Sequence, residues 1–249
     1  MNAPDFFELP VDGDANHKKW VLHGGSSSYF IGTFDGETFT PETPKLLYAE
    51  GKNVHGDDTL YAAESFAEMP DARRVQMGWG RVEHPGMPFS QMILFPTEFK
   101  LKSTNDGPRL RVTPIDELAR LRGKAESGAN LSIENANQKL RAAGFGPLDV
   151  ELQVALKGDE KLTIKYSGVP LATIEAADLE NGSGAVELLL DKSVAEIFVN
   201  QGARYLVSEV HTTADGRLEC NMGTSKTNIQ ELRIYRMKSI WKQRAASLH

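Results

Sequence analysis

Residues 60–100 read LYAAESFAEMPDARRVQMGWGRVEHPGMPFSQMILFPTEFK, and this stretch decides the fold. Three short segments stand out in it: Tyr61–Phe66, Arg73–Trp79 and Met87–Glu98. Turn signals separate similar short runs elsewhere in the chain, as at Phe34–Gly36 and Asn181–Gly184. Many short strands at such spacing are typical of a β-sandwich, a barrel or a propeller.

The clearest strand pattern outside this stretch lies between Leu148 and Leu156. Apolar residues occupy every second position there, which is the period of a strand with one buried face. The segment Val186–Val199 is more apolar, and we expect a strand that is buried on both sides for part of its length.

One helix is expected to interrupt the strands. Thr113 is expected to cap it, Pro114 suits its first turn, and Asp116 stands at the capping-box position. The residues Ile115, Leu118 and Leu121 share one face of this helix. The helix and the polar segment 123–128 after it mark a predicted domain boundary.

Composition sets limits on the function. The chain has 249 residues, 40% apolar and 25% charged, which suits one large or two ordinary globular domains. A net charge of −6 argues against a nucleic-acid partner or an anionic membrane surface. One cysteine, Cys220, excludes an internal disulfide framework and a thiolate metal cluster. We also find no apolar run of membrane-spanning length and no signal peptide.

The chain resembles the β-fructosidases of glycoside hydrolase family 32 over nearly its whole length. Four sets of segments occur in the family's order: Lys19–Leu22 with Tyr29–Phe39, then the segments of residues 60–100, then Leu190–Gly202, and finally Met237–Trp241. The third set is similar to the family's sandwich signature Asp-Arg-Ser-Ser-Val-Glu-Val-Phe. Each segment is weak alone, and their shared order carries the resemblance.

The resemblance implies an all-β fold in which the last blades of a five-bladed β-propeller are followed by a C-terminal β-sandwich. It divides the chain into a partial propeller of about two blades at 1–108, a linker helix and loop at 109–128, and the sandwich domain at 129–249. The segment Pro114–Leu118 matches the family's linker helix. Two blades cannot close a propeller, so we expect a homo-oligomer that covers the exposed blade face and strand edges.

Catalytic carboxylates are not found at the family's positions. A retaining glycosidase uses two carboxyl groups about 5 Å apart. The family's nucleophilic Asp lies in an Asn-Asp-Pro-Asn-Gly segment that has no match here. Its acid/base Glu lies in a Glu-Cys-Pro-Asp segment, which Met1–Pro10 resembles with Asn2 at the position of the Glu and Ala3 at that of the Cys. We therefore assign no catalytic residue.

Other polar residues are interpreted as structural. Asn105–Gly107 is expected to be a hairpin turn, and Asp5 a hydrogen-bonded structural carboxylate. Asp57 and Asp58 are expected in a solvated loop, because adjacent side chains of an extended segment point to opposite faces.

The histidines His23, His55 and His84 lack the spacing of a metal site, and we expect them at the surface or in loops. No metal and no cofactor is predicted. The segment Ser193–Phe198 is expected at an interface or in the core, and the sandwich is expected to have a structural role.

Tyr61 and Trp79 are the candidate substrate-binding residues. The resemblance implies that these aromatic rings lie at or near the funnel that binds a fructosyl unit, where a flat ring packs on the sugar and a polar tip reaches a hydroxyl. Alternatively, each ring is a strand residue that serves only in the core. Both interpretations of Tyr61 and Trp79 stay open. Glu64 and Gln91 are not assigned a sugar contact.

Three functions remain open at this stage. The first is a β-fructosidase fragment, related to enzymes that hydrolyse terminal fructosyl bonds of sucrose, levan or inulin, and inactive alone because the nucleophile and acid/base segments are missing. The second is a non-catalytic carbohydrate-binding or accessory protein, and the third is a truncated gene product without independent function. The expected partners are a fructose-containing sugar or fructan and a complementing N-terminal propeller polypeptide. Full-length relatives in the family are often secreted or periplasmic.

Overall fold

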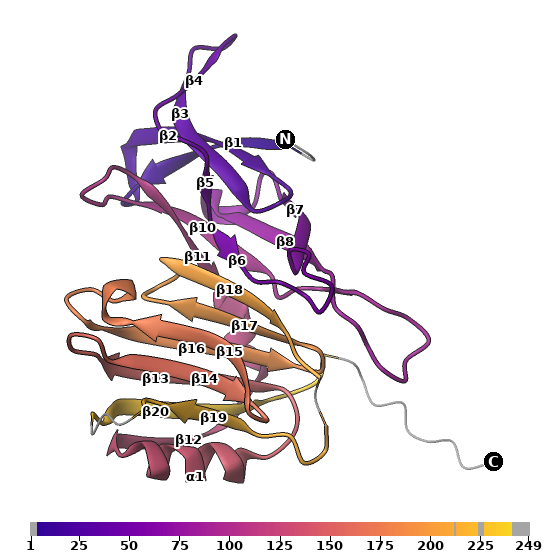
Figure 1. The fold of residues 1–249 in the computed structure, drawn as a ribbon. Coiled ribbons are helices and arrows are strands. Elements are labelled where there is room, and N and C mark those ends of the chain that lie inside the picture. Colours follow the sequence, from indigo (N-terminus) through magenta and orange to yellow (C-terminus); the bar gives the residue numbers. More distant parts are fainter. Residues whose placement is uncertain (1–3, 212, 224–226, 241–249) are drawn as a thin grey trace.

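The computed structural model describes residues 4–211, 213–223 and 227–240. Figure 1 shows two stacked parts: strands β1–β5 and β7–β11 form the upper part, and β12–β20 form the lower part, with helix α1 beneath it. Nearly all regular structure is β, as expected. Within the described ranges, no helix has both the length and the apolar character that crossing a membrane requires.

The upper part contains two antiparallel meanders. The strands of the first follow one another in the order β1, β2, β3, β4, and those of the second in the order β7, β8, β10, β11. A parallel contact between Val11 and Leu101 joins the two meanders into one sheet. The bounds are β1 Pro4–Val11, β2 Asp14–Gly24, β3 Ser28–Phe34, β4 Phe39–Pro41, β5 Leu46–Leu47, β7 Leu60–Ser65, β8 Arg74–Gly80, β9 Met92–Ile93, β10 Thr97–Lys102 and β11 Arg109–Pro114. The turn that closes β10 and β11 contains Asn105–Gly107, which confirms the predicted hairpin.

Alternate residues of both meanders build one core between them. Phe7 of β1 stacks on Phe99 of β10 with ring centroids 5.9 Å apart, and both rings are buried. A buried polar chain crosses this core: His23 Nε2 lies 2.9 Å from Tyr48 Oη, Tyr48 donates to Gln76, and Gln76 donates to Thr97. His23 is fully buried, so the surface position expected for it is wrong. Burial lowers its pKa to about 4, which keeps the ring neutral at neutral pH.

The lower part is a β-sandwich. A seven-stranded sheet has the order β12-β20-β13-β16-β17-β18-β6, and a three-stranded sheet has the order β15-β14-β19. The short strand β6 (Ala49–Glu50) comes from the first part of the chain and pairs with β18 in parallel. The bounds are β12 Arg122–Leu131, β13 Leu148–Ala155, β14 Lys161–Tyr166, β15 Val169–Glu175, β16 Ser183–Asp191, β17 Val194–Val199, β18 Arg204–Glu209, β19 Leu218–Asn221 and β20 Ile229–Met237.

Of the two strands expected at residues 148–156 and 186–199, the first is confirmed and the second is divided into two strands. The alternating pattern forms β13 as predicted, with its apolar residues in the sandwich core. The segment Val186–Val199 is not one strand, because a tight turn at Lys192 and Ser193 divides it into β16 and β17. Every residue of β17 is buried, as expected for a strand covered on both faces.

The helix prediction was wrong in type and in position. Thr113 and Pro114 end β11, where they pair with Glu98 and Thr97 of β10. The helix that follows is a short 3-10 helix, η2 (Asp116–Leu121), whose N-cap residue is Ile115 and which has no side-chain cap. Strand pairing holds Thr113 extended, so it cannot serve as the cap.

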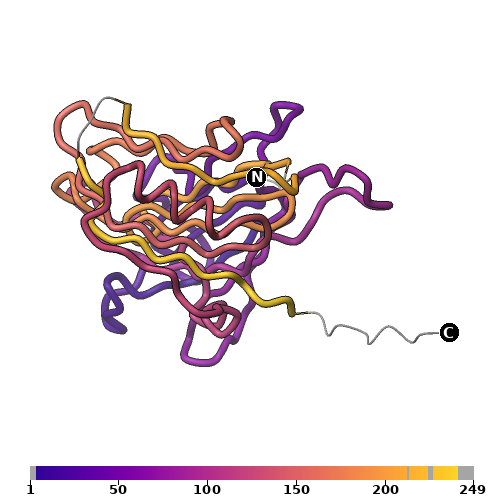
Figure 2. Tube along the Cα trace, turned by 90° about the horizontal axis from the view of Figure 1, so that it is seen from below, coloured from indigo at the N-terminus to yellow at the C-terminus, as the bar shows by residue number. Residues whose placement is uncertain are grey.

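Much of the predicted linker loop is strand. Residues 122–131 form β12, which pairs with β20 at the edge of the seven-stranded sheet. Figure 2 shows the C-terminal part of the described chain running along this edge.

One α-helix, α1 (Ile133–Ala143), was not predicted. Ser132 caps it by accepting a hydrogen bond from the Asn135 amide at 3.3 Å, and Ala136, Leu140 and Ala143 are buried against the sandwich. The Ser cap and the four-residue spacing of Ala136 and Leu140 are the signals that mark it in the sequence. Two further 3-10 turns are η1 (Pro70–Ala72) and η3 (Ala176–Asp178).

The two parts meet across strand β17. Ala195, Ile197 and Val199 face the sandwich core, whereas Val194 and Phe198 pack into the core of the upper part. The segment 193–198 therefore lies both in the core and at an interface.

Glu196 lies on the face of β17 that packs on the upper part. Its Oε1 accepts a hydrogen bond from the Phe95 amide at 2.8 Å, and its other oxygen accepts one from Tyr205. The backbone amides of Val54 and Glu83 donate to Glu209 in the same way. The acidic side chains of the sandwich thus bind the backbone of the first part.

Candidate functional site

Tyr61 and Trp79 lie side by side on neighbouring strands. They are directly opposite each other in the β7–β8 ladder, and their rings meet edge to face with centroids 6.0 Å apart. A β-bulge follows Tyr61, where Ala62 has a φ of 43°. Bulges re-aim the neighbouring side chains. Trp79 is 39% exposed, so the structure brings together the two residues expected at a sugar site and leaves one ring accessible.

Polar groups hold the two rings in place. The Trp79 indole Nε1 donates to Gln91 Oε1 at 3.0 Å. The guanidinium carbon of Arg81 lies 4.7 Å from the centre of the Tyr61 ring, and Arg81 Nε donates to the Asp58 carbonyl at 2.8 Å. From the sequence, Gln91 was not assigned a sugar contact and Arg81 was not considered, although the structure places both beside the rings.

Glycines on both sides of Trp79 fix its strand. A Cβ at Gly80 would lie 2.7 Å from Leu94 Cδ2, and one at Gly78 would lie 3.3 Å from Leu60. Leu60 and Leu94 are buried directly beneath this strand. The sequence Gly-Trp-Gly therefore lets the core approach β8 closely while the Trp79 side chain turns outward.

Asp5 is a structural carboxylate, as predicted. It accepts hydrogen bonds from the Ser65 amide at 3.1 Å and from the Ser65 hydroxyl, which ties β1 to the end of β7. Arg74 donates to Ser65 Oγ at 3.3 Å, and its guanidinium carbon lies 4.3 Å from the centre of the Phe7 ring. Asn2 and Ala3, which stand at the family's acid/base segment, lie outside the described residues.

The remaining candidates keep structural roles. Asp58 forms an ion pair with Lys52 at 2.7 Å, and Asp57 lies 4.0 Å from Arg81. His55 Nε2 lies 3.0 Å from Glu83 at the surface.

His84 lies in the loop after β8, as expected, and is half-buried. Its Nδ1 lies 2.9 Å from Ser193 Oγ, between the two parts of the molecule. Glu64 is exposed.

A cluster of three carboxylates was not predicted from the sequence. Oxygens of Asp149, Glu151 and Glu187 lie within 4.8 Å of one another. The Arg122 guanidinium reaches all three, at 2.6, 2.8 and 3.1 Å, and it also lies over the Tyr235 ring. Asp149 is 1% exposed, and burial raises the pKa of Glu187 to about 7. These groups surround a cation that the chain itself supplies, so we interpret the cluster as structural.

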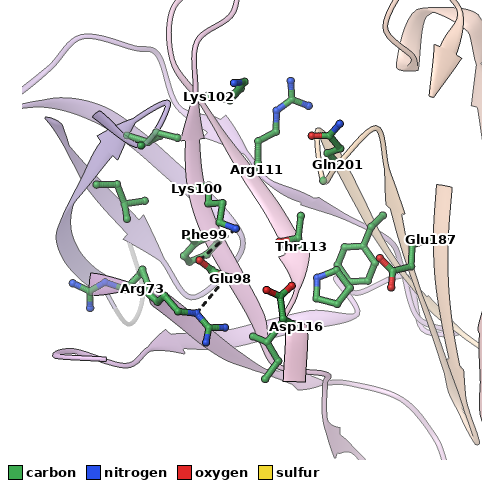
Figure 3. Close-up of a pocket in the computed structure, with 18 of the residues that line it drawn as sticks. Arg73, Glu98, Phe99, Lys100, Lys102, Arg111, Thr113, Asp116, Glu187 and Gln201 are labelled. Carbon is green, nitrogen blue, oxygen red and sulfur yellow. Dashed lines mark hydrogen bonds and ion pairs between the residues drawn. The ribbon is translucent and has the colours of Figure 1, made fainter. Parts of the chain in front are cut away.

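A large cavity lies between the two parts. Its volume is about 980 Å³, and it lies between the β10–β11 hairpin with η2 on one side and β16–β17 on the other. In Figure 3, Lys100, Lys102, Arg111 and Thr113 come from the hairpin, and Gln201 and Glu187 lie across from them.

No family model matches the chain. The levanase of Bacillus subtilis (strain 168) is 29% identical to it over an alignment of 295 positions, which covers 96% of this chain and 43% of the levanase. The chain thus spans less than half the length of this curated relative.

Solved structures share the fold. The exo-inulinase of Aspergillus awamori matches with a TM-score of 0.71 at 18% identity, covering 96% of this chain and 57% of that one. Fructan 1-exohydrolase IIa from Cichorium intybus, in complex with 1-kestose, matches with a TM-score of 0.70 at 17% identity, covering 94% and 61%.

These similarities first define a class, the all-β proteins that include levanase, exo-inulinase and fructan 1-exohydrolase. Within that class, the chain is related to the β-fructosidases of glycoside hydrolase family 32 and corresponds to their C-terminal portion. The predicted family is confirmed. The last segment of the resemblance ends at Trp241, which lies outside the described residues.

Proposed function

We propose that this chain supplies part of the fructosyl-binding surface of a β-fructosidase and is inactive alone. In this proposal, residues 1–108 form about two blades of a five-bladed propeller, 109–128 connect them, and 129–249 form the sandwich domain. The two meanders β1–β4 and β7–β11 support it, because each is a four-stranded antiparallel unit of the kind that builds a blade.

The observation that carries the proposal is the pairing of Tyr61 with Trp79. An exposed indole face beside a second aromatic ring suits the apolar C–H face of a sugar, and Gln91 and Arg81 lie next to the rings with groups that can bind hydroxyls. Related proteins have been solved with 1-kestose and with fructosylnystose, both oligosaccharides. We therefore propose a terminal fructosyl unit of a fructan as the ligand.

A complementing polypeptide is part of the proposal. We expect it to carry the family's nucleophile and acid/base segments and to cover the outer face of β1–β4. Four half-buried aromatic rings cluster on this face: Phe6 and Trp20 stack at 4.6 Å, and Phe34 and Phe39 meet Phe6 edge to face at 5.1 and 5.5 Å. The second candidate function is a non-catalytic fructan-binding protein, since the Tyr61 and Trp79 pair lies within this chain.

Replacing Trp79 with alanine is expected to weaken binding of short fructans about tenfold or more. An aromatic face that packs on a sugar contributes on the order of 1–2 kcal/mol, which corresponds to roughly a tenfold change in Kd. Isothermal titration with inulin fragments measures it, and Trp79→Phe should retain part of the affinity.

Phe145→Ala is the matched control, because Phe145 is also an exposed aromatic but lies in the sandwich part. Circular dichroism checks that each variant is folded. Equal affinity of Trp79→Ala and the parent chain would contradict the assignment, and so would an equal loss in Phe145→Ala.

In the absence of a complementing polypeptide, the chain is expected to form a homodimer or higher oligomer through its first 108 residues. Exposed apolar side chains are frequent there and include Leu47, Phe66 and Ile93. Each 100 Å² of apolar surface removed from water is worth about 2.5 kcal/mol before the entropic cost of association. Sedimentation velocity measures the mass, and a monomer at micromolar concentration would refute this expectation.

A further inference from the structure

Four cations lie opposite one another on the β10–β11 hairpin. Lys100 pairs with Arg111 in the ladder, and Lys102 pairs with Arg109. Cross-strand partners place their side chains on the same face of a sheet, and like charges directly opposite each other are destabilising. Two successive pairs of this kind stand out in a protein whose net charge is −6.

The carboxylates nearby neutralise only some of these cations. Lys100 Nζ lies 3.5 Å from Glu98, which Arg73 also contacts, and Lys102 Nζ lies 3.0 Å from Asp12. The two arginines donate to backbone carbonyls instead: Arg109 to Pro108 at 2.9 Å and Arg111 to Asn200 at 3.2 Å. Backbone carbonyls carry no full charge, so both guanidinium groups keep theirs.

Arg111 is half-buried, whereas the two lysines are exposed. Burial lowers the pKa of Arg111 below the usual range, although the charge of Glu180 acts in the opposite direction. Arg111, Lys100 and Lys102 all line the cavity of about 980 Å³ between the two parts of the molecule. Figure 3 shows Lys102 and Arg111 close together, with Gln201 of the β17–β18 turn across from Arg111, and Lys100 further along the hairpin beside Glu98.

We propose that this basic end of the cavity binds a phosphate group, either free or carried by a small sugar. Three cationic side chains from two adjacent strands line a space that has room for such a ligand. The planar guanidinium of Arg111 suits a bidentate contact with a tetrahedral oxyanion, and the two lysines supply further charge. The Gln201 amide can donate from the opposite side.

The test is a thermal unfolding series on the full chain. Inorganic phosphate, fructose 6-phosphate and fructose are each compared with sodium chloride at matched ionic strength. At ten times the Kd, phosphate is expected to raise the midpoint by about 3 °C, whereas fructose leaves it unchanged. A Kd for fructose 6-phosphate at least tenfold below that of phosphate identifies a sugar phosphate, and equal values identify the free anion.

The double variant K100Q/R111Q is expected to raise the phosphate Kd at least tenfold. The matched control is K45Q/K124Q, which also removes two positive charges, from exposed positions outside the cavity. The single variant Lys100→Gln, at a side chain that is 61% exposed, keeps the test valid if the double variant is unfolded. The proposal is overturned if phosphate acts no more strongly than sodium chloride, or if the control loses as much affinity as K100Q/R111Q.

Discussion

Purified by itself, the chain is expected to release fructose from sucrose, inulin or levan no faster than a buffer control. Carboxylates of this part of the chain are engaged in structural contacts: Asp5 is bound to Ser65, Asp58 to Lys52, and Asp57 lies 4.0 Å from Arg81. Loss of both catalytic carboxyl groups removes on the order of a million-fold or more of the rate acceleration.

The measurement is a fructose assay on sucrose, inulin and levan over a tenfold range of protein concentration. Because a contaminating hydrolase would give the same product, the Trp79→Ala variant purified in parallel is the control. Fructose release that scales with the concentration of the parent chain, and falls in Trp79→Ala, would contradict the expectation of inactivity.

The second large effect is expected at Glu196, where the sandwich binds the first part of the chain. Glu196→Ala is expected to lower the free energy of unfolding by about 3–5 kcal/mol, because it leaves the Phe95 amide and the Tyr205 hydroxyl buried without their acceptor and opens a cavity. Glu196→Gln keeps a carbonyl oxygen in place, so we expect a change within about 1 kcal/mol at pH 5.5.

The same pair of variants tests the charge on Glu196. Burial raises the pKa of this carboxyl to about 7 from a usual value of 4.5, so the folded state favours the protonated form. Its contribution to stability is therefore fully present below pH 4.5 and is lost as the pH rises through 7. Glu196→Gln removes this dependence. The free energy of unfolding of the variant minus that of the parent chain should therefore be more positive at pH 8 than at pH 5.5.

Urea unfolding at pH 5.5 and pH 8 measures both effects, with Glu126→Gln at an exposed position of β12 as the control. His23 does not mask the comparison, because it is present in every variant. If Glu196→Gln were as unstable as Glu196→Ala at both pH values, the hydrogen bonds described here would not explain the role of the carboxyl group.

The strands were largely predictable from the sequence. β13 follows its alternating pattern, and the hairpin turn after β10 carries its turn residues. The helix after β11 was mistaken, because the pairing of Thr113 with Glu98 overrides a local capping signal. The division of Val186–Val199 was also missed, because a turn at Lys192 and Ser193 contains neither glycine nor proline.

The candidate site was predictable only in part. Tyr61 and Trp79 could be selected from their motifs, and ladder pairing explains why they meet. The position of Gln91 depends on how the loop after β8 returns to the rings, which no local pattern encodes. Arg81 directly follows β8, two residues after Trp79, so the strand period could have placed it near the rings.

The Arg122 cluster brings together residues of three strands that are distant in the sequence, so it could not be predicted. The same holds for the buried chain of hydrogen bonds from His23 to Thr97.

The most direct test of the central claim is fructose release by a complex. The chain is co-expressed with a polypeptide that carries the nucleophile and acid/base segments of a β-fructosidase, and the purified complex is assayed on inulin and levan. We predict a stable complex whose activity exceeds that of either component by orders of magnitude and falls at least tenfold with Trp79→Ala but not with Phe145→Ala. A stable complex without activity would contradict the claim and favour the non-catalytic fructan-binding protein, and no complex would leave only a truncated product.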